Sequence, residues 1–135
     1  MARYLSISPV QEPFDPGAAP KGRVELLFNV SCWKVPSGTL IEELLKRLEA
    51  QGVGTRGSNM FGSSAAQLPD GDGPYLSVIA TGGAAPDYIQ NLASPAYQHA
   101  SAQIAVRGAK WTEVEAMAYA AYNALSSVRN TTLST

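Results

Sequence analysis

The stretch from Ser101 to Leu125 constrains the fold most, because it joins a strand pattern to a helix pattern through a very short turn. Ala102, Ile104 and Val106 occupy every second position, which is typical of a strand with one buried face. Gly108 is expected to end this strand. The segment therefore predicts a strand and a helix that pack against each other.

The helix of this segment is predicted to begin with a capping box formed by Thr112 and Glu115. Its apolar residues recur at intervals of three and four, which predicts one buried stripe: Val114, Met117, Ala118, Ala121, Leu125 and Val128. The opposite side is poor in charge and carries Ala116, Tyr119, Ala120 and Tyr122. We expect a second surface, such as a neighbouring subunit, to cover that side.

The front of the chain reads as two strands joined by a loop. Tyr4 to Ile7 alternates like a short edge strand, and Pro13 to Gly22 is rich in Pro, Gly and Ala, which predicts an exposed loop. The segment Arg23 to Trp33 gives the clearest strand pattern of the chain. Its predicted core face holds Val24, Leu26, Phe28, Val30 and Cys32.

A second capping box, Thr39 with Glu42, predicts the start of another helix, and Gly52 suits the position just after its end. The apolar stripe of this helix is Leu40, Leu44, Leu45 and Leu48. Met60 and Phe61 could form a brief strand after it.

The next predicted strand runs from Tyr75 to Ala80, is covered on both sides and ends at Thr81-Gly82-Gly83. We interpret Gly82 to Ala100 as a long connecting arm, because loops of that length inside a compact domain are usually functional.

Together these elements predict an α+β fold with a mainly antiparallel sheet of four to five strands and two helices on one face. We expect one domain over residues 1–135, with an N-terminal β-hairpin (1–36) and a helix-strands-helix body (37–135). The net charge of -1 disfavours direct DNA binding, and no hydrophobic run approaches the length of a membrane span. A single cysteine and no signal-peptide pattern fit a reducing cytoplasm.

The sequence predicts no catalytic, metal or cofactor site, and we expect a protein that is not an enzyme. His99 is the only histidine and Cys32 the only thiol; we expect the thiol to be buried and the histidine to lie at a surface or interface. Asp70 and Asp72 resemble a fragment of a calcium loop, but the later ligands are missing. We interpret both aspartates as turn residues.

Three segments carry a resemblance to a known family: Leu40 to Gly54, Tyr75 to Gly83, and Ser101 to Leu125. Their order and spacing resemble the phage tail terminator family, the minor capsid proteins of long-tailed phages. In that family a hairpin follows the second helix, whereas here Tyr4 to Trp33 looks like that hairpin moved to the front. Such a circular permutation requires Ala2 to lie near the tail Arg129 to Thr135.

The resemblance implies a homo-oligomeric ring, expected to be a hexamer, in the virion at the head-tail junction after assembly in the host cytoplasm. The ring would cap the head-proximal end of the tail tube. Its partners would be the tail tube protein and the head connector or neck protein. DNA would pass through its lumen without specific binding. It implies no cofactor. The candidate subunit contacts are Gly82, Gly83, Tyr88, Tyr97, Arg107, Tyr119 and Tyr122.

Other interpretations remain open at this point. A head-completion or neck protein would also form a ring but would contact the portal instead of the tube. A small non-viral ligand-binding or hydrolase domain could use Asp70, Asp72 and His99. The simplest alternative is an α+β domain that forms no ring.

Overall fold

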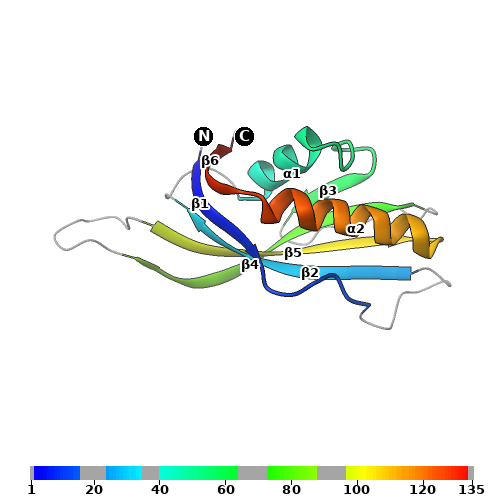
Figure 1. Ribbon diagram of the computed structural model, residues 1–135, viewed down its shortest axis with the longest axis horizontal. Helices are drawn as coiled ribbons and strands as arrows, with labels where there is room; N and C mark the ends of the chain where they lie inside the picture. The colour runs from blue at the N-terminus through cyan, green and yellow to red at the C-terminus, as the bar shows by residue number, and fades with distance from the viewer. Residues whose placement is uncertain (1, 16–23, 35–39, 64–72, 88–96, 134–135) are drawn as a thin grey trace.

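The computed structural model describes residues 2–15, 24–34, 40–63, 73–87 and 97–133 (Figure 1). The described strands are β1 (Ala2–Pro9), β2 (Val24–Lys34), β3 (Met60–Ser63), β4 (Tyr75–Asp87), β5 (Tyr97–Gly108) and β6 (Arg129–Leu133). The helices are α1 (Leu40–Ala50) and α2 (Trp111–Ser126).

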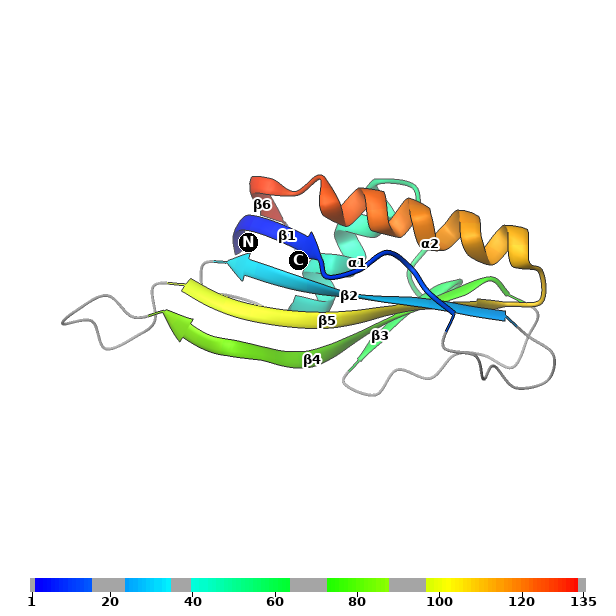
Figure 2. The ribbon, with the colours of Figure 1, turned by 60° about the horizontal axis from the view of Figure 1, so that its bottom comes forward.

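The described strands form one sheet in the order β3-β4-β5-β2-β1-β6, in which only β3 and β4 pair in parallel. Both helices lie on the same face of this sheet (Figures 1 and 2). The predicted α+β class and its mainly antiparallel sheet are confirmed. The described sheet has six strands instead of four to five, because the polar segment Arg129–Leu133 adds β6 at one edge.

β2 and β5 form the centre of the sheet and pair along their whole length, from Val24 opposite Gly108 to Lys34 opposite Gln98. The alternation predicted for β2 is present, since Leu26, Phe28, Val30 and Cys32 are buried. The alternation of β5 is confirmed in the same way, with every second residue from Ala102 to Val106 fully buried. Most of the core therefore lies between this central pair and the helices.

The predicted apolar stripe of α2 is buried as expected, but the predicted capping box is wrong. The helix begins at Trp111, and its N-cap residue Lys110 makes no side-chain capping hydrogen bond. Thr112 therefore lies inside the first turn. Only Ala109 and Lys110 separate the end of β5 from the helix, so the chain turns into α2 before it reaches Thr112.

Helix α1 ends as its sequence predicts. Gly52 has a φ of 78°, its N–H donates to Glu49 O at 3.0 Å, and the N–H of Val53 donates to Leu48 O at 3.0 Å. This is a Schellman motif, which favours glycine at the left-handed position. Of the predicted capping box, Thr39 lies outside the described residues, and the carboxylate of Glu42 is paired with Arg56.

The expected loop from Gly82 to Ala100 is wrong at both of its ends, and its middle, positions 88–96, lies outside the described residues. β4 continues to Asp87 and β5 begins at Tyr97, so the segment extends a β-hairpin. The glycines do not end β4 because the pairing with β5 shifts register between Ala80 and Gly82, where Gly82 adopts a φ of 94°, and then resumes.

The beginning of the predicted front loop is attached to the sheet. Pro13 is buried, and Phe14 exchanges two backbone hydrogen bonds with Leu27, both 2.9 Å long. The part of the loop at positions 16–22 lies outside the described residues.

The two ends of the chain lie side by side, as the permuted order requires. β1 pairs with β6, so that Ala2 lies opposite Leu133 (Figure 1). β1 also pairs with β2, which confirms the predicted front hairpin.

Candidate functional site

The two tyrosines predicted as subunit contacts on α2 have different surroundings. The side chain of Tyr119 is 37% exposed on the outer side of the helix. Tyr122 is half-buried and packs edge-on against Phe28, with ring centroids 5.7 Å apart. The sequence predicts that both tyrosines lie on the outer side of the helix. This prediction is wrong for Tyr122, because its position on the helix turns its ring toward β2. The exposed side of α2 carries Trp111, Ala116, Tyr119 and Ala120, which we call the helix patch, and it also carries the charged residues Glu113 and Glu115.

The remaining predicted contacts lie on the sheet. Gly82 and Gly83 pair with Ser101 and Ala100, and Tyr97 pairs with Asp87 at the far end of the same hairpin. Arg107 lies near the other end of β5, opposite Glu25 of β2 and Tyr75 of β4. Tyr88 lies outside the described residues. The predicted contacts therefore do not gather into one site with Tyr119.

The sheet face turned away from both helices is a surface that the sequence analysis did not single out. Trp33 is 42% exposed there and stacks on His99, with ring centroids 6.3 Å apart and planes at 16°. Phe61 and Tyr75 are in contact at the β3 end of this face, with centroids 6.2 Å apart. We call Trp33, His99, Phe61, Tyr75 and the outward-facing Leu27 the sheet patch.

The strand alternation could have identified this patch, since Leu27 and Trp33 have the opposite parity to the core residues of β2. From Val24 to Trp33, β2 pairs with β5, which in turn pairs with β4. Over this length the charged side chains of the outer face are Glu25 and Arg107, which lie opposite each other on β2 and β5. His99 lies at a surface, as the sequence predicts.

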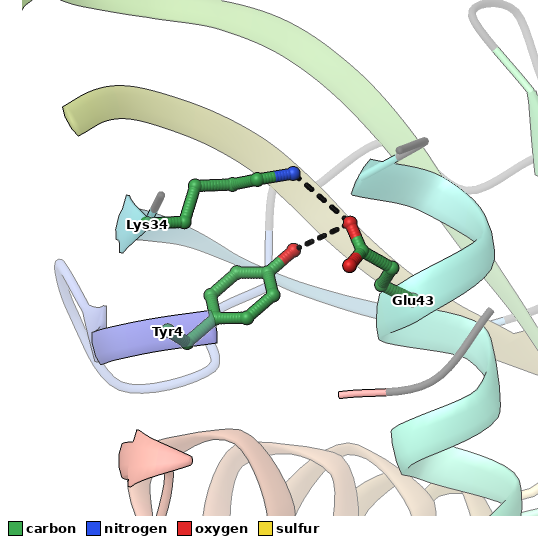
Figure 3. A network of polar contacts seen from close by, with 3 residues as sticks. All are labelled: Tyr4, Lys34 and Glu43. Atoms are coloured by element: carbon green, nitrogen blue, oxygen red, sulfur yellow. Dashed lines mark hydrogen bonds and ion pairs between the residues drawn. The ribbon is translucent and has the colours of Figure 1, made fainter. Parts of the chain in front are cut away.

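A buried polar network joins three elements of the helix-covered face (Figure 3). Nζ of Lys34 in β2 lies 2.9 Å from Oε1 of Glu43 in α1, and the hydroxyl of Tyr4 in β1 donates to the same oxygen at 3.3 Å. Lys34 is 2% exposed and Glu43 is fully buried. Nζ also lies 5.3 Å from the centroid of the Tyr4 ring. Oε2 of Glu43 has no hydrogen-bond partner in the part of the chain that the structure describes.

Burial also changes the acid-base chemistry near this network. Loss of water contact, together with the nearby Glu43 carboxylate, raises the pKa of Tyr4 well above its ordinary value of 10.0. Burial raises the pKa of the Cys32 thiol from 9.0 to about 12, although Lys34 acts in the opposite direction. Both groups are therefore neutral near pH 7, and Cys32 is a buried apolar residue, as its place in the strand predicts.

An open groove of about 550 Å³ lies between α1 and β3 and includes Glu42, Glu49, Arg56 and Phe61 in its lining. Arg56 binds both of its carboxylates. Arg56 pairs with Glu42 through its guanidinium, and its backbone N–H donates to Glu49 Oε2 at 3.0 Å. This arrangement does not indicate a particular ligand.

No group of three or more His, Cys, Asp or Glu side chains gathers among the described residues in a way that could hold a metal ion. Asp70 and Asp72 lie outside those residues. In the same described part of the chain, no helix is long and apolar enough to cross a membrane. Comparisons with protein-family models, with curated proteins and with solved structures find no match.

Proposed function

We propose that this protein is a structural virion protein, a phage tail terminator whose copies form a closed ring, expected to be a hexamer. The ring caps the head-proximal end of the tail tube and joins it to the head connector. The resemblance of three segments to that family supports the proposal. So does the pairing of Ala2 with Leu133, because a circularly permuted terminator needs adjacent chain ends.

The observation that supports a ring most is the presence of two different aromatic patches on opposite layers of one domain. The helix patch exposes Trp111 and Tyr119, and the sheet patch exposes Trp33. A ring of identical subunits needs two unlike surfaces, one to contact the preceding copy and one to contact the next. Exposed aromatic residues are typical of such contacts. On the helix patch the exposed Glu115 lies between Trp111 and Tyr119, one turn from each.

The sheet face that carries the sheet patch offers most of the area of a subunit interface. β2 and β5 have 11 and 12 residues, and they are flanked by β4 and β3 on one side. With about 3.3 Å per residue and about 4.8 Å between strands, this face covers roughly 600 Å². Stable interfaces bury about 800 Å² on each partner, so the whole face could supply most of that area, and the sheet patch is a part of it.

The assignment of the two patches is tested with one charged substitution in each. Tyr119→Glu disables the helix patch and Trp33→Glu disables the sheet patch. Each variant alone should be monomeric, whereas an equal mixture should form a heterodimer, because one intact pair of patches remains. Lys46→Glu, a charge change on the exposed side of α1, is the control and should leave the ring intact. A mixture that stays monomeric while the unmodified protein forms rings would show that these patches are not the contact.

The role at the tube is tested with the tail tube protein encoded in the same phage genome. Added to growing tubes, the protein should stop elongation and appear in electron micrographs as one extra ring at one end. Tyr119→Glu should lack this effect. Binding to filled heads but not to tubes would instead support the head-completion function, and unchanged growth with binding to neither would contradict both.

A further inference from the structure

Three hydroxyl groups cross the sheet face that is turned away from the helices, and we call them the hydroxyl row. Ser31 of β2 lies opposite Ser101 of β5, and the hydroxyl of Ser101 lies 2.8 Å from that of Thr81 in β4. Ser31 and Thr81 are exposed. Because a hydroxyl both donates and accepts, the one that accepts between Thr81 and Ser101 keeps its own proton for another acceptor. The row therefore presents hydrogen-bond donors to whatever covers this face.

An aromatic row and an amide row lie on either side of the hydroxyl row. Trp33 stacks on His99 on one side, and Asn29 lies opposite Gln103 on the other. Each is two residues along the strands from the hydroxyl row, which corresponds to about 6.6 Å. These three rows contain no carboxylate, and His99 is their only group that can carry a charge, which is positive. They therefore offer nothing that repels an acidic side chain.

The exposed side of α2 carries a row of similar spacing. Trp111, Glu115 and Tyr119 follow one another at four-residue intervals, so they are neighbours along one side of the helix. Successive members lie about 6.0 Å apart along the helix axis, close to the distance between rows of the sheet. A helix laid along β5 with Glu115 over the hydroxyl row therefore brings one of its two aromatic residues over Trp33 and His99, whichever way the helix runs.

We propose that Glu115 sets the position of α2 on the sheet of the next copy, by accepting hydrogen bonds from the hydroxyl row. This inference rests on the proposed ring, in which the helix patch of one copy contacts the sheet patch of another. When the two surfaces meet, Glu115 loses water, which is unfavourable unless hydrogen-bond donors replace that water. The hydroxyl row supplies donors, and hydrogen bonds to a carboxylate are stronger than those between neutral groups.

The two neighbouring positions of the helix are less favourable. A shift by one row toward the amides keeps a donor for Glu115, but it moves both aromatic residues of the helix away from Trp33 and His99. A shift in the other direction places the carboxylate over those two rings and an aromatic residue over the hydroxyl row. Only the proposed position satisfies the carboxylate and the aromatic residues together.

The test introduces a charge into the hydroxyl row of the full-length protein. Ser31→Glu places a second carboxylate against Glu115 and should reduce the ring to a monomer in native mass spectrometry. Ser31→Lys adds a long side chain of the opposite charge and should keep the ring. Ser31→Glu/Glu115→Lys reverses both charges and should restore the ring. Because Ser31 is exposed, all variants should keep the far-UV circular dichroism spectrum of the unmodified chain.

Ser31→Glu/Glu113→Lys is the matched control, because it has the same net charge as the charge-reversed variant. Two residues turn a helix by about 200°, so Glu113 does not share the row of Glu115, and this control should stay monomeric. If the unmodified protein forms rings, a ring in Ser31→Glu or in the control, or a monomer in Ser31→Lys or in the charge-reversed variant, would overturn the role of Glu115 alone. A monomeric unmodified protein would contradict the ring as well.

Discussion

Nζ of Lys34 and Oε1 of Glu43 are 2.9 Å apart in a site from which water is almost excluded. Removing one partner of such a pair leaves a buried charge, which costs about 3–5 kcal/mol. Glu43→Ala should therefore lower the free energy of unfolding by that amount in urea denaturation, and Lys34→Ala should have a similar effect.

Replacing the whole network with apolar residues should have a different result. In the triple variant Tyr4→Phe/Lys34→Met/Glu43→Leu no polar group of the network is left, so the free energy of unfolding should stay unchanged or rise by up to about 4 kcal/mol. A triple variant as unstable as Glu43→Ala would show that the polar contacts themselves stabilise the fold.

The beginning of α2 provides a second prediction. Lys110 is in an extended conformation suited to an N-cap but makes no capping hydrogen bond, and its positive charge is unfavourable at a helix N-terminus. Lys110→Asp should raise the free energy of unfolding by about 0.5–2 kcal/mol. Thr112→Ala is the control and should change it by less than about 0.5 kcal/mol, because exposed positions without special contacts have small effects. A clear loss of stability in Thr112→Ala would restore the capping box that the sequence predicts.

Stability should fall at alkaline pH. When unfolded, Cys32 and Tyr4 lose their protons near their ordinary pKa values of 9.0 and 10.0, whereas in the folded chain both pKa values are raised, that of Cys32 to about 12. Above pH 9 the unfolded state therefore binds fewer protons than the folded state, and the free energy of unfolding decreases. Each group contributes a slope of up to about 1.4 kcal/mol per pH unit.

Urea denaturation from about pH 8 to about pH 11 measures this decrease. Cys32→Ala should remove the decrease in the free energy of unfolding between pH 9.0 and pH 10.0, the ordinary pKa values of the two groups. Tyr4→Phe should make the decrease above pH 10.0 less steep. A free energy of unfolding that is constant over this range would contradict the assigned burial of both groups.

Much of the fold can be predicted from the sequence, because the apolar residues of β2, β5 and the helices repeat with the periods of their elements. β6 could not be predicted in this way. Arg129–Leu133 has no apolar alternation, and its strand depends on pairing with β1 at the other end of the chain. The extension of β4 beyond Thr81 was missed because a double glycine usually ends a strand, whereas here it accommodates a register shift.

The candidate surfaces were only partly predictable. The helical period placed Tyr119 correctly on the outer side of α2, but it could not resolve Tyr122, which lies at the margin of the buried stripe. Lys34 has the same parity as Phe28, Val30 and Cys32, so its burial has a signal in the sequence. A lysine at the end of a strand is nevertheless usually exposed, and its partner Glu43 is identified only by the packing of α1.

The mass of the assembled protein tests the central claim most directly. Native mass spectrometry and sedimentation velocity at micromolar concentration should give one closed species at six times the 14.2 kDa of a single chain. Tyr119→Glu and Trp33→Glu should each reduce it to a monomer. A monomer at every concentration, both alone and with tail tubes, or an open series of oligomers of increasing size, would contradict the ring.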